Sequence, residues 1–215
     1  MATSVQTIIT AAYLRSSLND PGKLAQNAEL IGHLNRAYQR SWMLIARARP
    51  DQYAASTDLT FAGVPPTASL PANLIDLLDV TDADGATVNI IPATQRTRTW
   101  NLAPCIYRVG MSLKTRGDAD DPIAGDVMTV LYLDAPEALD ALADELDTRW
   151  PVRHDQLLVD YLAMYLSVKD AGRDNNDRQA LIAEQRSNAA AFAAEYALAP
   201  SQVGWLHADA ERATA

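Results

Sequence analysis

Hydrophobic residues recur every three or four positions in two stretches near the N-terminus, residues 4–18 and 28–49. That spacing places them on one face of an α-helix, so both stretches are predicted to be amphipathic helices. A turn is predicted between them at residues 19–22, where Pro and Gly favour a change of direction. Pro50 disfavours the helical conformation at Arg49 and is expected to end the second helix.

The second of these helices has a basic face opposite its apolar stripe. Projected down a helix, Arg36, Arg40 and Arg47 fall on the far side from Leu30 and Leu34. Such a face is either solvated or a contact at which arginines meet the carboxylates of a neighbouring subunit. We assign the three arginines to a candidate subunit interface.

The periodicity changes between residues 53 and 134, where apolar and polar residues alternate as they do in half-buried strands. Residues 82–85, Asp-Ala-Asp-Gly, separate two strand-like runs and predict a hairpin. The predicted strands are residues 57–61, 77–81, 86–91, 105–109, 111–114 and 126–133. Five or six short strands in a segment of about 80 residues indicate a small sandwich or barrel.

Helical spacing returns after residue 135. Residues 136–147 predict a short acidic helix, residues 154–171 a strongly apolar one, and residues 177–198 a last, alanine-rich one. The apolar helix is hydrophobic around nearly its whole circumference, so we expect its own bundle to cover one side and a partner subunit the other. The residues assigned to the bundle side are Leu157, Tyr161, Met164 and Val168, and those assigned to the subunit boundary are Leu162 and Leu166.

The C-terminal stretch, residues 201–215, is polar and alanine-rich except for Val203, Trp205 and Leu206. Large apolar side chains are not expected in a tail that stays solvated, and a buried Trp is a frequent anchor at protein interfaces. These three residues are therefore a candidate docking site for a partner protein.

These patterns predict an α+β chain in which two N-terminal and two C-terminal helices form a bundle, interrupted by a small β-sandwich or barrel. The predicted boundaries are residues 1–52 for the first half of the bundle, 53–134 for the β domain, 135–200 for the second half and 201–215 for a docking tail.

The composition is that of an acidic globular protein, with 48% hydrophobic residues, 21% charged residues and a net charge of −9. A protein that binds DNA through its phosphates needs a basic surface, so DNA binding is not expected. Acidic residues are concentrated between residues 115 and 148, where Asp118, Asp120 and Asp121 are the clearest group. This segment is either a solvated surface or a wall past which DNA slides without adhering.

Sequence signatures of catalysis are missing. The three histidines are far apart, and no phosphate-binding loop, nucleophile elbow or zinc motif occurs. Cys105 is the only cysteine and is expected to be buried and inert. The chain has no signal-peptide pattern and no apolar run long enough to cross a membrane, so we expect a cytosolic, non-enzymatic protein without a cofactor.

Several short motifs lie in a recognisable order along the first ninety residues. They are Leu18-Asn19-Asp20-Pro21-Gly22, residues 28–37, Ala48-Arg49-Pro50-Asp51-Gln52-Tyr53, Ser69-Leu70-Pro71 and Leu77-Leu78-Asp79-Val80. In this order the chain resembles the head-to-tail adaptor, or connector, proteins of bacteriophages. The second half agrees more loosely, and residues 94–101 and the acidic segment after Thr115 depart from the family pattern.

The resemblance implies a ring of about twelve identical subunits in the neck of the virion, assembled in the host cytoplasm. In such a ring the helical part contacts the portal protein, the C-terminal segment with Val203, Trp205 and Leu206 reaches along it, and the β domain meets the next tail protein. DNA would pass through the channel, past Asp118, Asp120 and Asp121, without specific binding. Two other classes stay open on sequence alone, a bacterial cytosolic interaction module and a small cell-wall glycan hydrolase.

Overall fold

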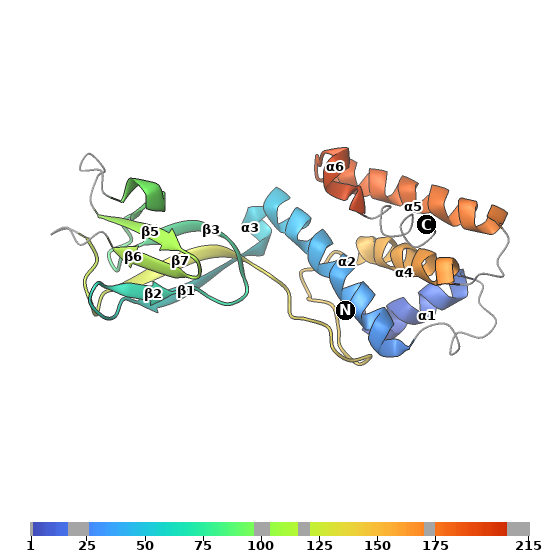
Figure 1. Cartoon of the computed structure of the whole chain (residues 1–215), viewed down its shortest axis with the longest axis horizontal. Helices are drawn as coiled ribbons and strands as arrows, with labels where there is room; N and C mark the ends of the chain where they lie inside the picture. The colour runs from blue at the N-terminus through green and yellow to red at the C-terminus, as the bar shows by residue number, and fades with distance from the viewer. Residues whose placement is uncertain (1, 17–25, 97–103, 116–120, 170–174, 206–215) are drawn as a thin grey trace. The chain divides into compact units, whose positions relative to one another are not determined.

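A computed structural model describes residues 2–16, 26–96, 104–115, 121–169 and 175–205 of this mixed α+β chain (Figure 1). The chain divides into two compact units. The helical unit contains Met1–Arg49 and Pro136–Ala215, and the β unit contains Pro50–Ala135. The boundaries expected from the sequence, residues 53 and 134, lie close to these.

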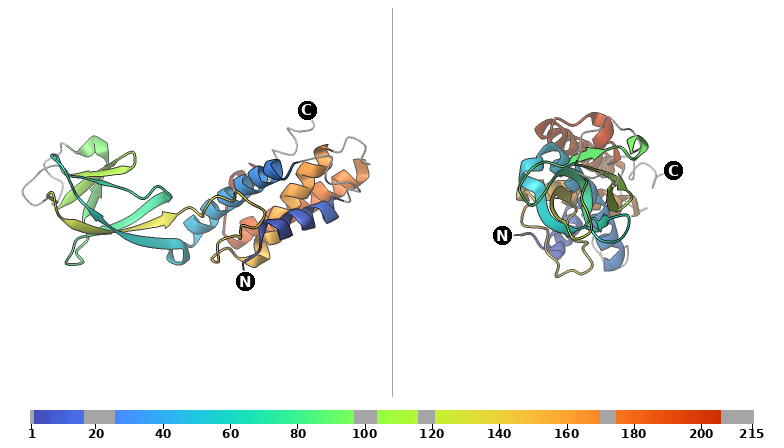
Figure 2. Two further views of the ribbon diagram at one scale, coloured as in Figure 1. Left: turned by 90° about the horizontal axis from the view of Figure 1, so that it is seen from below. Right: turned by 90° about the vertical axis from the view of Figure 1, so that its left-hand side faces the viewer.

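Helices from both ends of the chain build the helical unit. They are α1 (Val5–Arg15), α2 (Asn27–Ala48), α4 (Asp155–Lys169), which a 3-10 turn (Val152–His154) precedes, α5 (Asn175–Glu195) and α6 (Pro200–Val203). Four of the predicted helices, α1, α2, α4 and α5, are thereby confirmed within a few residues of their expected ends, and α2 stops before Pro50 as expected. The central element is α4, which packs against α1, α2 and α5 (Figure 2).

Backbone donors at the start of α1 are satisfied by a distant part of the chain. Ser4 caps the helix, since its hydroxyl accepts a hydrogen bond from the Thr7 N–H at 3.2 Å. The N–H groups of Val5 and Gln6 have no helical acceptor, and they donate to carbonyl oxygens of residues 142–144 at 2.9 and 3.1 Å. The first turn of α1 therefore fixes the segment that leads into α4.

The prediction of an acidic helix at residues 136–147 is wrong, because this segment consists of extended chain and turns. Asp144 accepts hydrogen bonds from the N–H groups of Asp140 and Ala141 at 2.7 and 2.8 Å, which stabilise a turn in place of a helix. The carbonyl groups of Leu142 and Asp144, which a helix would use internally, bond to α1.

The covering of α4 also differs from the prediction. Leu162 and Leu166 are 0% exposed in the single chain, so the chain's own helices cover the side assigned to a subunit boundary. Leu157, Tyr161 and Met164 are buried as predicted. With α1, α2 and α5 around it, α4 is enclosed without a partner.

Two sheets make up the β unit, preceded by the short helix α3 (Pro50–Tyr53). The first sheet has the order β1 (Ala54–Thr60), β7 (Val127–Asp134), β3 (Leu74–Thr81) and is antiparallel. The second has the order β2 (Thr67–Ser69), β6 (Ser112–Thr115), β5 (Cys105–Val109), β4 (Asn89–Ile91). Neither sheet closes into a barrel within the described residues, so the barrel alternative is wrong.

Strand β7 is the centre of the first sheet, and its burial alternates. Met128, Val130 and Tyr132 point into the core, whereas Val127 and Leu131 are exposed. The inward residues join side chains from both sheets in one hydrophobic cluster, which also contains Phe61, Ala68, Leu70, Val80, Val88, Ile106 and Leu113. One core therefore holds the two sheets together.

The hairpin predicted around residues 82–85 is only half correct. The turn forms, since Gly85 has a φ of +81° and the Asp82 carboxylate accepts from the N–H groups of Asp84 and Ala86. Only a bridge at Thr87 continues the antiparallel pairing with β3. The chain then crosses to the second sheet, where β4 runs parallel to β5.

Candidate interaction surface

The C-terminal segment docks on the chain's own helical unit. Val203, at the end of α6, is 5% exposed. Trp205 is half-buried, and its ring contacts Tyr161 of α4 with ring centroids 6.1 Å apart. The guanidinium of Arg40, on α2, lies 5.4 Å from the centre of the Trp205 ring, a cation–π distance. The described part of the segment predicted to anchor in a partner protein, residues 201–205, therefore occupies a site on this chain.

A tight turn connects α5 to this segment. The N–H of Leu198 donates to the carbonyl of Ala193 at 2.8 Å, and the N–H of Ala197 donates to the carbonyl of Ala194 at 3.3 Å. This pair of bonds is the Schellman arrangement that ends many helices, and it places Ala197 in the left-handed region with a φ of +51°. Glycine is the residue usually found there, because a Cβ disfavours that conformation.

These contacts change the assignment of the predicted docking residues. Val203 is withdrawn as a residue that binds the portal protein, because its side chain is buried on the helical unit of this chain. Trp205 keeps part of its ring exposed while it contacts Tyr161 and Arg40. Leu206 lies outside the described residues.

The arginines assigned to a subunit interface do lie on the outer face of α2. Arg36 and Arg47 are exposed, and Arg40 is half-buried under Trp205. Leu162 and Leu166 are withdrawn from that interface, because the helical unit buries them completely. Arg36 and Arg47 are therefore accessible at the surface of the chain, whereas Leu162 and Leu166 are not.

Of the acidic residues predicted to line a channel, only Asp121 is described. It is 4% exposed, and its carboxylate accepts a hydrogen bond of 3.0 Å from the N–H of Cys105. A buried carboxylate that fixes a strand end does not face a channel, so this assignment is corrected. Asp118 and Asp120 lie outside the described residues. Cys105 is buried, as predicted.

Sequence reasoning missed an ionic cluster inside the helical unit. Asp160 of α4 is 2% exposed, and one of its carboxylate oxygens lies 2.6 Å from Nε of Arg15 on α1. The side-chain amides of Gln156 and Asn188 also donate to this carboxylate. Arg15 additionally pairs with Glu184 of α5. The signal was available, since Asp160 interrupts the apolar run of its helix and a buried carboxylate requires partners.

A pocket of about 160 Å³ opens between the start of α4 and the end of α5. Buried His154 lines it, and its Nε2 lies 2.9 Å from the Tyr196 hydroxyl. Burial lowers the pKa of His154, although the nearby Glu195 carboxylate opposes the shift. Glu195 is held by an ion pair with Arg153. Because the described residues that line the pocket include no serine, threonine or cysteine, it lacks the nucleophile that covalent hydrolysis by a side-chain hydroxyl or thiol requires.

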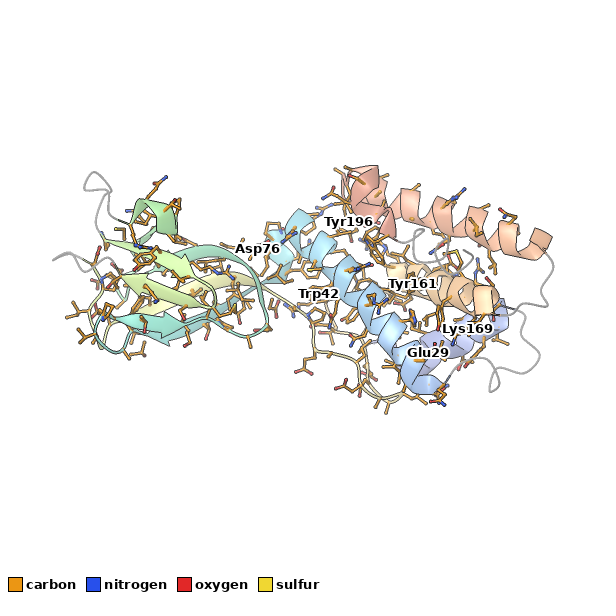
Figure 3. The ribbon with its side chains drawn as sticks, in the orientation of Figure 1. Glu29, Trp42, Asp76, Tyr161, Lys169 and Tyr196 are labelled. Atoms are coloured by element: carbon orange, nitrogen blue, oxygen red, sulfur yellow. The ribbon has the colours of Figure 1, made fainter. Side chains whose placement is uncertain are left out.

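Another polar contact, at the surface, joins α2 to α4. One carboxylate oxygen of Glu29 accepts from Nζ of Lys169 at 2.5 Å and from the Tyr165 hydroxyl (Figure 3). The hydrogen bond from Lys169 lowers the pKa of Glu29, and the one from Tyr165 adds to the effect. This contact ties together segments from opposite ends of the chain.

Across the described ranges, no group of three or more His, Cys, Asp or Glu side chains has the geometry of a metal site. None of the helices in the same ranges is long and apolar enough to cross a membrane. Neither a scan against protein-family models nor a search of curated proteins finds a match to this chain.

Proposed function

We propose that this chain is a non-enzymatic subunit of a bacteriophage head-to-tail connector. In this role it forms a homo-oligomeric ring in the neck of the virion, seats on the portal protein, continues the DNA channel and provides the attachment surface for the tail. It uses no cofactor, and DNA passes through the ring without specific binding. The acidic composition, with a net charge of −9, supports a channel that does not retain DNA.

The observation that carries the proposal is the division of the chain into two units with separate interiors. Both ends of the chain build the helical unit, and residues 50–135 build the β unit with its own hydrophobic cluster. A subunit that joins two different structures can present one surface on each unit, and this organisation offers two such surfaces. The helical unit is the proposed portal side and the β unit the proposed tail side.

We further infer that α1, α2, α4 and α5 form a helical bundle and that the two sheets form a sandwich. The enclosure of α4 by three helices supports the bundle. The hydrophobic cluster shared by both sheets supports the sandwich.

An apolar end of the β unit supports a protein contact there. Backbone hydrogen bonds join Phe61 to Gly125 and Asp126, so the loops after β1 and before β7 lie together. Val64 on the first loop is 99% exposed, and Ile123 on the second is also exposed. Two exposed apolar side chains on adjoining loops offer a surface that a protein partner would cover.

The arginine face of α2 is the proposed contact with a neighbouring subunit. Arg36 and Arg47 are exposed there, and the chain as a whole carries an excess of carboxylates. Such charges set orientation and register more than they add affinity.

The proposal is tested by measuring binding to two candidate partners from the same genome, the portal protein and the first tail protein. We expect the chain to bind both. The variant Val64→Asp/Ile123→Asp should lose the tail protein and keep the portal, because both changes lie on the β unit. As a matched control, Ser56→Asp/Thr60→Asp places two charges at exposed positions of β1 and should bind both partners. A chain that binds neither partner contradicts the proposed function.

A further inference from the structure

We propose that copies of this chain associate by exchanging their C-terminal segments, so that α6 and Trp205 of one copy occupy the site on the next copy that they occupy here on their own chain. The inference goes beyond the proposed function, because it concerns how copies join and not what the ring connects. The partner is a second copy of this chain, and the docking site is formed by α2, α4 and α5.

The docking site of the C-terminal segment is built from side chains of other helices. Val203 is buried, and Trp205 packs between Tyr161 and Arg40, which belong to α4 and α2. A third contact is made by α6 against α5. The segment is thus bound by side chains of other elements, and the same side chains on another copy offer it an identical site.

The connection between α5 and α6 is strained. Ala197 holds a φ of +51°, which allows the chain to reverse after α5 and bring α6 back onto its own unit. For an alanine this conformation is disfavoured by roughly 5- to 30-fold relative to the helical one. The docked position on the same chain therefore depends on a residue that is poorly suited to it.

The local sequence favours an alternative conformation of this connection. Residues 189–199 read Ala-Ala-Ala-Phe-Ala-Ala-Glu-Tyr-Ala-Leu-Ala, and alanine and leucine are among the strongest helix formers. If Ala197 adopts helical angles, α5 continues toward Pro200, before which a helix ordinarily stops. The segment after Pro200 then points away from its own site and is available to another copy.

Exchange retains the anchor contacts and relieves the strain at Ala197. Its cost is the entropy of association, so exchange must increase with concentration. Short hinges under strain are known to favour this kind of exchange between protomers. Because each copy donates one segment and accepts one, a reciprocal exchange closes a two-fold dimer, whereas exchange with the next copy in line is head-to-tail and closes a ring when the rotation allows it.

The test compares full-length chains by sedimentation velocity over a series of concentrations. Ala197→Gly permits the left-handed conformation and should weaken self-association by roughly 5- to 30-fold. Ala197→Val disfavours that conformation further, because valine is β-branched, and should strengthen self-association. Adding Trp205→Ala to Ala197→Val should abolish the gain, since it removes the anchor.

Circular dichroism first establishes that each variant is folded. If Ala197→Val does not fold, the comparison of Ala197→Gly with the natural chain decides alone. The same association constant for both overturns the proposal, and so does self-association of Ala197→Val that Trp205→Ala leaves unchanged. A natural chain and a folded Ala197→Val variant that both stay monomeric at all concentrations overturn it as well. Because no portal protein is present, these outcomes are independent of whether the chain binds a portal.

Discussion

Nε of Arg15 lies 2.6 Å from a carboxylate oxygen of Asp160, and this ion pair joins the first helix of the chain to α4 in the interior of the helical unit. The Asp160 side chain is almost completely shielded from solvent. Two side-chain amides complete its coordination, so the carboxylate keeps hydrogen bonds in place of the water that it lost.

Removing this carboxylate should destabilise the helical unit strongly. We expect Asp160→Ala to lower the free energy of unfolding by about 3 kcal/mol or more, because it leaves a partly buried guanidinium without the buried carboxylate that it pairs with. The control is Glu184→Gln, which removes the more exposed carboxylate that Arg15 contacts and should cost less than about 1 kcal/mol. Urea unfolding followed by the helical circular dichroism signal measures both. Equal effects of the two changes would contradict the central place of Asp160.

The same residue shows what the sequence could and could not predict. Helical periodicity located α1, α2, α4 and α5, because their apolar faces are long and regular. It did not identify what α4 packs against, since an apolar circumference is equally compatible with a partner subunit and with three helices of the same chain. That question depends on contacts between residues as distant as Arg15, Asp160 and Glu184.

Local patterns were less informative where tertiary hydrogen bonds decide the conformation. Residues 136–147 have helical composition, yet their carbonyl groups bond to the start of α1. Strand β2 is only three residues long and lies between prolines, so alternation could not reveal it. For the candidate surface, the exposed arginines of α2 followed from helical projection, whereas the docking of Trp205 on its own chain depends on the turn at Ala197.

Leu166 offers a direct test of how α4 is covered. A charge at Leu166 would be buried inside the helical unit, so we expect Leu166→Asp to prevent that unit from folding and not merely to impair assembly. Leu14→Asp is the matched control, because Leu14 is 79% exposed on α1 and should tolerate the same change. Circular dichroism and thermal unfolding distinguish the two. A folded, stable Leu166→Asp monomer would contradict the enclosure of α4.

Ala197 should be a site at which glycine stabilises the protein. We expect Ala197→Gly to raise the free energy of unfolding of the helical unit by about 1 kcal/mol, since glycine adopts a positive φ without a Cβ clash. The same substitution at exposed Ala190, in the interior of α5, should have the opposite sign and cost about 1 kcal/mol. Thermal unfolding at low protein concentration measures both variants. A loss of stability at Ala197 would show that the turn is not strained.

His154 should make the stability of the helical unit depend on pH. Its pKa is lowered in the folded chain because burial disfavours the imidazolium, so above the ordinary value of 6.5 the ring is neutral in both states. As the pH falls below 6.5, the unfolded chain takes up a proton before the folded chain does, and stability is lost down to the folded pKa.

Chemical unfolding at a series of pH values below and above 6.5 measures this dependence. His154→Gln should flatten the part of the curve just below pH 6.5 relative to the natural chain. Unchanged pH dependence in His154→Gln would contradict the assignment.

The proposed role is tested most directly by deleting the gene from the phage genome that encodes the chain and imaging the particles by electron microscopy. A connector subunit predicts DNA-filled heads without tails together with free tails, and purified chain added to that mixture should restore tailed, infectious particles. Normal tailed particles in the absence of the chain would contradict the proposal.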